Sequence, residues 1–243
     1  MHETVQRLLQ RCRGVLQYAI VTSRAERNPA SELRGALKSP QRENYAALSA
    51  ADLPEYLKAL DAYEGHIQTK LALKLLALTF VRSGELRAAQ WSEFDLGHAD
   101  WRIPAERMKM RVEHLVPLSR QAVEALEQLK ALTGRGRFLF PNQSKSDACM
   151  SENTMLYALY RMRYHSRATG HGLRATASTI LNEQGWKADA IERQLAYAER
   201  NKVRAACHRS EYLDERRKMM QAWADYLDAL RSGASVANIR RAA

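Results

Sequence analysis

Apolar residues recur at the spacing of an α-helix along most of this chain of 243 residues, which limits it to a mainly helical fold. One helix is predicted over residues 3–22, with an apolar stripe made of Val5, Leu8, Leu9, Cys12, Val15, Leu16, Ala19 and Ile20. A second region begins at a capping-box-like start over residues 48–52. Further helices are predicted from Ser119 to Gly134 and over residues 151–168, 172–184, 187–196, 202–210 and 214–231.

One interval, residues 91–118, departs from helical spacing. Three short runs in it, residues 94–96, 101–103 and 114–118, are typical of strands, with turns between them. We therefore predict a mainly α fold that carries a small three-stranded antiparallel sheet, an α+β arrangement.

The charge of the chain indicates an anionic partner. Lysine and arginine exceed aspartate and glutamate by 38 to 27, a formal net charge of +11. These cations are scattered over a folded chain and form no low-complexity tail, which suits the phosphate backbone of double-stranded DNA better than a membrane surface.

Other features indicate the compartment. The three cysteines, at positions 12, 149 and 207, match neither metal-ligand spacing nor an even disulfide framework, as expected in a reducing cytoplasm. The first residues lack the pattern of a signal peptide, and the longest apolar run, residues 71–81, is too short to span a bilayer. We expect a cytoplasmic protein without a membrane partner.

Four residues in three settings suggest phosphate chemistry. Arg82 follows an apolar helix, Lys109 lies just before the third predicted strand, and His171 and Arg174 open a predicted helix. At a spacing of three residues, His171 and Arg174 share one helix face. Together the four would offer fixed positive charge and a proton-transfer group, which phosphoryl transfer requires where no metal takes part.

The order of these residues, with their flanks at residues 175–186 and 191–196, resembles the tyrosine recombinases, also called phage integrases. The resemblance covers about residues 1–230 and is closest to integrases of satellite phages and genomic islands. It implies the recombinase catalytic-domain fold, double-stranded DNA attachment sites as the partner, a homo-tetramer on DNA, no cofactor, and a place at the bacterial nucleoid.

The resemblance also implies a role for each residue. Arg82 and Arg174 look like the two arginines that clamp the scissile phosphate, and Lys109 looks like the hairpin lysine that protonates the leaving 5′ oxygen. His171 looks like the general acid/base histidine. The nucleophile of this family is a tyrosine that forms a 3′-phosphotyrosyl link with DNA.

Two positions depart from the family pattern. Tyr197 stands where a histidine or tryptophan is usual, and Cys207 stands at the nucleophile position. A thiolate is a poor substitute for a phenolate in an attack on a DNA phosphate, because its sulfur is soft and its reach differs. Tyr212, five residues on, is the nearest phenol and the candidate substitute. The structural alternatives are a packing aromatic at 197 and a small buried residue at 207.

The resemblance divides the chain into parts. Residues 1–27 look like the last helix of a core-binding domain, of which the rest is expected to be missing from this sequence. Residues 28–45 are the expected linker, 46–231 the catalytic domain and 232–243 a C-terminal tail.

Three functional classes stay open from the sequence. The first is an integrase catalytic domain that cuts and rejoins DNA. The second is a pseudo-recombinase that binds attachment sites without cutting, which Tyr197 and Cys207 favour. The third, a basic helical adaptor, is disfavoured by the joint occurrence of the four residues.

Overall fold

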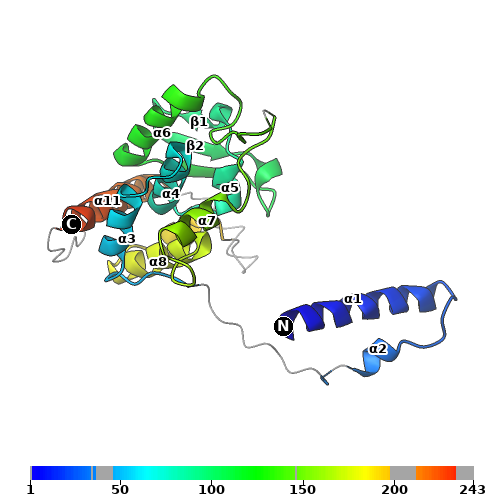
Figure 1. Cartoon of the computed structure of the whole chain (residues 1–243). Helices are drawn as coiled ribbons and strands as arrows, with labels where there is room; N and C mark the ends of the chain where they lie inside the picture. The colour runs from blue at the N-terminus through cyan, green and yellow to red at the C-terminus, as the bar shows by residue number, and fades with distance from the viewer. Residues whose placement is uncertain (1, 34, 37–45, 146, 198–211, 234–243) are drawn as a thin grey trace. The chain divides into compact units, whose positions relative to one another are not determined.

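The computed structural model describes residues 2–33, 35–36, 46–145, 147–197 and 212–233 (Figure 1). The chain divides into two compact units, Met1–Asn44 and Tyr45–Ala243.

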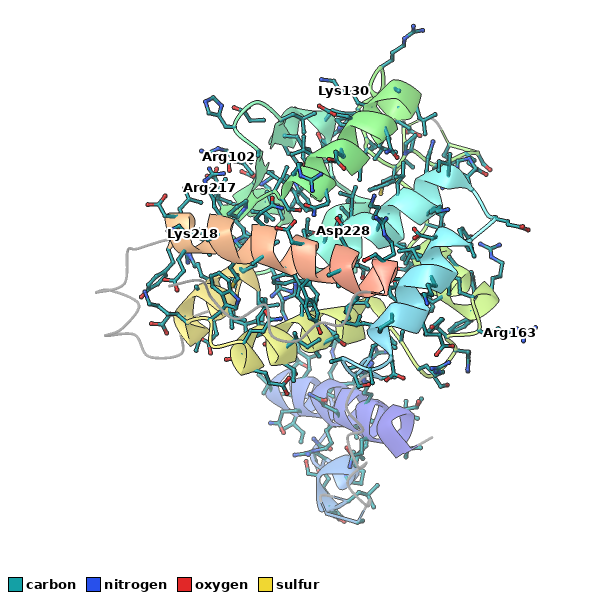
Figure 2. The ribbon with its side chains drawn as sticks, turned by 90° about the vertical axis from the view of Figure 1, so that its left-hand side faces the viewer. Arg102, Lys130, Arg163, Arg217, Lys218 and Asp228 are labelled. Carbon is teal, nitrogen blue, oxygen red and sulfur yellow. The ribbon has the colours of Figure 1, made fainter. Side chains whose placement is uncertain are left out.

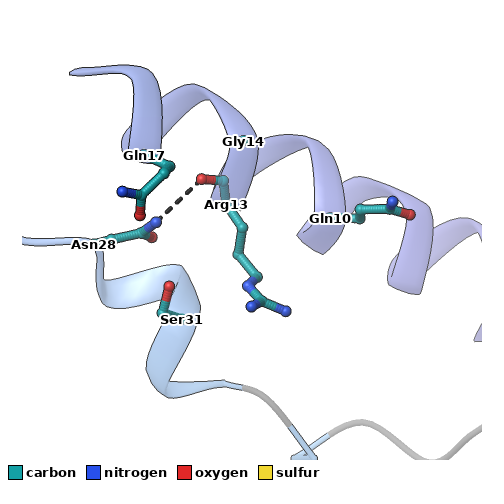
Figure 3. A pocket seen from close by; sticks show the side chains of 6 residues that line it. All are labelled: Gln10, Arg13, Gly14, Gln17, Asn28 and Ser31. Carbon is teal, nitrogen blue, oxygen red and sulfur yellow. Dashed lines mark hydrogen bonds between the residues drawn. The ribbon is translucent and has the colours of Figure 1, made fainter. Parts of the chain in front are cut away.

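The first unit is a helical hairpin. The predicted first helix is confirmed as α1 (His2–Val21), and a short helix α2 (Pro29–Glu32) lies within the expected linker. The Asn28 side-chain amide donates to the Arg13 carbonyl oxygen at 3.1 Å and so joins the two helices. Figure 3 shows the polar groove between them, of about 350 Å³, lined by Gln10, Arg13, Gly14, Gln17, Asn28 and Ser31.

The second unit is built around one buried helix, α4 (Ile67–Thr79), whose apolar residues face inward on nearly every side. A helix that is apolar all round belongs in the middle of a core. The helices that pack on it are α3 (Leu53–Asp61), α5 (Ser83–Arg87), α6 (Arg120–Thr133), α7 (Thr154–Arg161), α8 (Gly170–Glu183) and α11 (Leu213–Ser232).

The three predicted strands are confirmed as β1 (Phe94–Asp95), β2 (Asp100–Ile103) and β3 (His114–Pro117), in the order β1-β2-β3 with antiparallel pairing. The short 3-10 helix η1 (Trp91–Glu93) precedes β1, and the 3-10 helix η2 (Ala105–Arg107) lies between β2 and β3. The α+β prediction is therefore confirmed.

Most predicted helices are found with small shifts. The helix after Ser119 is α6, and the Ser119 hydroxyl accepts the Ala122 N–H at 3.3 Å. The predicted helix over 151–168 was too long, because Arg163 and Ser166 take positive φ angles of 67° and 61°, which no α-helix accommodates. The helix predicted over 202–210 lies outside the described residues.

Helix α11 crosses the second unit and contacts α3, α4, α6, α9 (Ala188–Gln194) and β3. Its inner face is anchored by Trp223, whose indole N–H donates to the Ala77 carbonyl oxygen of α4 at 2.9 Å. Figure 2 shows Arg217 and Lys218 near the start of this helix and Asp228 near its end. Among the described residues, no helix combines the length and apolar character needed to cross a bilayer.

Candidate active site

The end of α4 places Arg82. Phe80 takes a left-handed conformation with φ of 39°, which stops the helix while its ring stays buried against Trp223. The chain then turns, and Arg82 becomes the N-cap of α5. The Glu85 carboxylate accepts the Arg82 backbone N–H at 2.9 Å and its guanidinium at 2.6 Å. Glu85 thus fixes both the backbone and the side chain of Arg82.

The start of α8 places His171 and Arg174. The Thr169 hydroxyl accepts the Gly172 N–H at 2.9 Å and caps the helix. Gly172 packs so closely that a Cβ there would lie 1.9 Å from the Ala46 carbonyl oxygen, so only glycine fits. His171 and Arg174 are the second and fifth residues of this fixed helix, three residues apart at its start, as predicted.

The C-terminal end of α9 brings the two arginines together. Arg174 donates to the Leu195 carbonyl oxygen at 2.8 Å and to the Phe80 carbonyl oxygen at 2.6 Å. Arg82 donates to the carbonyl oxygen of Ala196 at 3.3 Å. Carbonyls at a helix C-terminus lack intrahelical partners and carry partial negative charge, so this end orients two cations.

The charges in this cluster affect one another. Burial and then the nearby Arg82 charge lower the pKa of Arg174. Burial and then the charges of Arg174 and Arg82 lower the pKa of His171. Two guanidinium groups are thus held close despite their repulsion, and an anion bound between them would relieve it. The lowered pKa keeps His171 neutral near pH 7, the form that accepts a proton.

Tyr197 covers the buried arginine. The Arg174 guanidinium carbon lies 5.9 Å from the centroid of the Tyr197 ring, and Arg174 is 2% exposed while Tyr197 is 48% exposed. A cation over an aromatic face is attracted by it. Tyr197 therefore belongs to the same cluster as Arg82, His171 and Arg174.

Lys109 forms no hydrogen bond to this cluster among the described residues. It is exposed in the turn between η2 and β3, and within the described ranges its ammonium makes no hydrogen bond or ion pair. The base of its hairpin is tethered, because Arg107 donates to the Glu93 carboxylate and to the Glu85 carbonyl oxygen. Lys109 is therefore carried on an anchored hairpin, two residues after the arginine that ties this hairpin to α5.

The two remaining candidates are not placed in the cluster either. Cys207 lies outside the described residues. The Tyr212 hydroxyl donates to Asp189 at 3.3 Å, in the first turn of α9, whereas the arginines bind the opposite end. Six residues of helix separate Asp189 from Leu195, roughly 9 Å along the axis.

The sequence interpretation missed a buried polar group beneath the arginines, formed by His114, Gln194 and Arg216. Its members come from β3, α9 and α11, so no local spacing signals them. Glu85 was also missed, although its position three residues after the N-cap is that of a capping box and could have indicated it.

His114 makes stability depend on pH. Burial, followed by the charge of Arg216, lowers its pKa to about 3; Arg193 and Arg174 also act against its protonation, while a hydrogen bond to the Gln194 carbonyl oxygen acts the other way. In the unfolded chain His114 binds a proton near pH 6.5, whereas in the folded chain it stays neutral at that pH. The unfolding free energy therefore falls as the pH falls below 6.5.

We expect this residue to remove about 1.4 kcal/mol of unfolding free energy between pH 7.5 and 5.5. Urea unfolding at both pH values gives the loss of unfolding free energy for the unmodified chain and for His114→Asn. The contribution of His114 is the loss in the unmodified chain minus the loss in the variant. An equal loss in both proteins would contradict the assignment.

The chain is similar to known proteins over most of its length. Residues 47–211 match the model described as Phage integrase family, and residues 1–36 match the Phage integrase central domain. The chain is similar to the integrase of Enterobacteria phage P4, with 48% identity over 95% of this chain and 56% of the relative. It therefore spans little more than half the length of that relative.

Two solved structures share the fold. A lambda integrase dimer bound to a COC' core site superposes with a TM-score of 0.62 at 19% identity, covering 87% of this chain and 74% of that chain. A lambda integrase tetramer bound to a Holliday junction gives 0.60 at 22% identity, covering 80% of this chain and 58% of that one. The predicted recombinase catalytic-domain fold is confirmed.

Proposed function

Because the chain belongs to the phage integrase family of tyrosine recombinases, we propose that it binds double-stranded DNA at attachment sites as a site-specific recombinase. In this role Arg82 and Arg174 hold one DNA phosphate. The names of the solved neighbours, which are lambda integrases on a core site and on a Holliday junction, support DNA as the partner and a homo-tetramer on it as the working assembly.

The observation that carries this proposal is the pair of arginines at the end of α9. Within the part of the chain that the structure describes, Arg82 donates to Glu85 and Ala196, and Arg174 donates to Phe80 and Leu195. The Tyr197 side chain also hydrogen-bonds to Arg174. A guanidinium has five N–H donors, so each retains donors for a phosphate. Nothing about stability requires two like charges to be held this close, whereas phosphate binding does.

With an oxygen nucleophile in place of Cys207, the proposed site carries out two transesterifications. An oxygen nucleophile attacks the phosphorus, the bond to the 5′ oxygen breaks, and that oxygen takes a proton from Lys109. The 5′ hydroxyl of another strand later attacks the protein–DNA phosphodiester and restores the nucleophile. His171 exchanges the proton of the attacking group, and the two arginines stabilise the charge that develops on the non-bridging oxygens.

The proposed grip on phosphate is testable by salt dependence. We expect Arg82→Ala to weaken binding to duplex DNA and to reduce the slope of log K against log salt by about one unit, because one fewer phosphate is neutralised. Fluorescence anisotropy over a salt series measures both. The control is Lys130→Ala, which removes one positive charge from an exposed position of α6 away from the cluster (Figure 2). Equal slopes for Arg82→Ala and the unmodified chain would refute the clamp.

A second function is favoured by Cys207, which occupies the nucleophile position in the sequence. In that case the chain binds attachment sites and does not cut them. Both functions share the phosphate clamp, and covalent attachment to DNA separates them.

A further inference from the structure

A buried junction of polar side chains lies directly behind the arginine cluster. Arg216, at the start of α11, is 1% exposed, and Gln194 is fully buried. The Gln194 side-chain oxygen accepts two hydrogen bonds from Arg216, at 3.1 and 2.8 Å, and the Leu115 carbonyl oxygen of β3 accepts a third. One guanidinium thereby joins α9, α11 and the sheet.

Gln194 stands at the point where the phosphate-binding residues are held. It is the last residue of α9, and the next two carbonyls along the chain, those of Leu195 and Ala196, accept from Arg174 and Arg82. Its side-chain N–H donates to the Thr79 carbonyl oxygen at 3.3 Å, one residue before the Phe80 carbonyl that also holds Arg174. The Gln194 amide thus ties together both sets of carbonyls.

A contribution to folding stability does not by itself explain why Arg216 is buried here. Taking a guanidinium out of water is costly, and well-packed apolar residues often replace buried charges without loss of stability. The junction does supply geometry, because a planar guanidinium that makes three hydrogen bonds to two oxygens fixes its neighbours in direction as well as distance.

We propose that Arg216 and Gln194 are positioning residues, which set the end of α9 so that Arg82 and Arg174 face one phosphate. The inference rests on the proposed function and goes beyond it, because neither residue belongs to the set that contacts DNA. It also assigns α11 a task in the site besides covering the core.

The test is a double-mutant cycle with Arg216→Met and Gln194→Met, both of which keep much of the side-chain length and remove the polar contacts. We expect each single variant to weaken binding to duplex DNA at least tenfold, and the double variant to bind no more weakly than the worse single one, because both break one linkage.

Leu227→Ala, a buried core residue of the same helix away from the junction, is the control. It is expected to lower stability in urea unfolding yet bind DNA as the unmodified chain does. If folded Arg216→Met binds like the unmodified chain, or if the two single effects add, the proposal is wrong.

A second readout needs no DNA and separates this inference from the proposed function. The titration of His171, followed by NMR, reports its burial and then the charges of Arg174 and Arg82 beside it. In Arg216→Met its pKa is expected to rise toward the ordinary histidine value, while Leu227→Ala leaves it in place. An unchanged His171 pKa in Arg216→Met overturns the positioning role. Absence of DNA binding by the unmodified chain counts against the proposed function alone.

Discussion

The Cys207→Tyr variant is expected to form a covalent adduct with a nicked suicide duplex on which the unmodified chain forms none. The suicide duplex is cut from the ends of the element that encodes the chain, and the adduct is a shifted band on a denaturing gel. The reason is chemical: a phenolate oxygen attacks phosphorus readily, whereas the thiolate at this position is soft and of different reach. In the proposed function the two arginines, His171 and Lys109 on its tethered hairpin assist the attack.

Two controls make the result specific. Cys207→Phe supplies the same ring without the hydroxyl and is expected to give no adduct. Tyr212→Phe in the Cys207→Tyr background is expected to keep the adduct, since the Tyr212 hydroxyl is engaged by Asp189 at the far end of α9. An adduct with the unmodified chain that disappears in Tyr212→Phe would instead make Tyr212 the nucleophile.

Replacing Arg174 with lysine in the Cys207→Tyr background is expected to slow adduct formation by a factor of about 10² to 10³, the usual effect of losing one preorganised donor to developing negative charge. Lysine keeps the charge but not the planar fork that reaches the Phe80 and Leu195 carbonyls while facing a phosphate. Single-turnover time courses at saturating protein measure the rate.

The matched control for this prediction is Arg120→Lys, the same change on an exposed arginine of α6 that pairs with Glu124. It is expected to leave the rate unchanged. If adduct formation slowed equally in both variants, or if Arg174→Lys kept the full rate, the fork geometry of Arg174 would have no part in the reaction.

The sequence predicted those parts of the fold that depend on near neighbours. Helix α6 was found between its capping serine and its terminal glycine, because both caps act within one turn. His171 and Arg174 were placed on one face by their spacing alone. The end of α7 was misjudged, since Arg163 and Ser166 take positive φ angles, which residues other than glycine rarely adopt and which the apolar spacing does not signal.

The contacts that position the site could not be predicted, because they join residues that are far apart in the sequence. Arg216 bonds to Gln194, 22 residues away, and to Leu115, 101 residues away. Such pairs form only after the helices and the sheet have packed, and one sequence contains no periodic signal for them. Lys109 shows the converse: its place on a hairpin was predicted, whereas the anchoring of that hairpin by Arg107 required coordinates.

The way Arg174 is anchored has a consequence for what the site accepts. Arg174 is oriented by the neutral carbonyls of Phe80 and Leu195, whereas Arg82 forms an ion pair with the Glu85 carboxylate. Among the described residues of the cluster, and leaving aside Lys109 on its hairpin, two guanidinium groups and one carboxylate leave one net positive charge, with His171 neutral. A DNA phosphodiester carries one negative charge and balances it, whereas a terminal phosphate monoester, nearly doubly charged at neutral pH, does not. The proposed clamp is therefore matched in charge to the interior of a strand and mismatched to its phosphorylated ends.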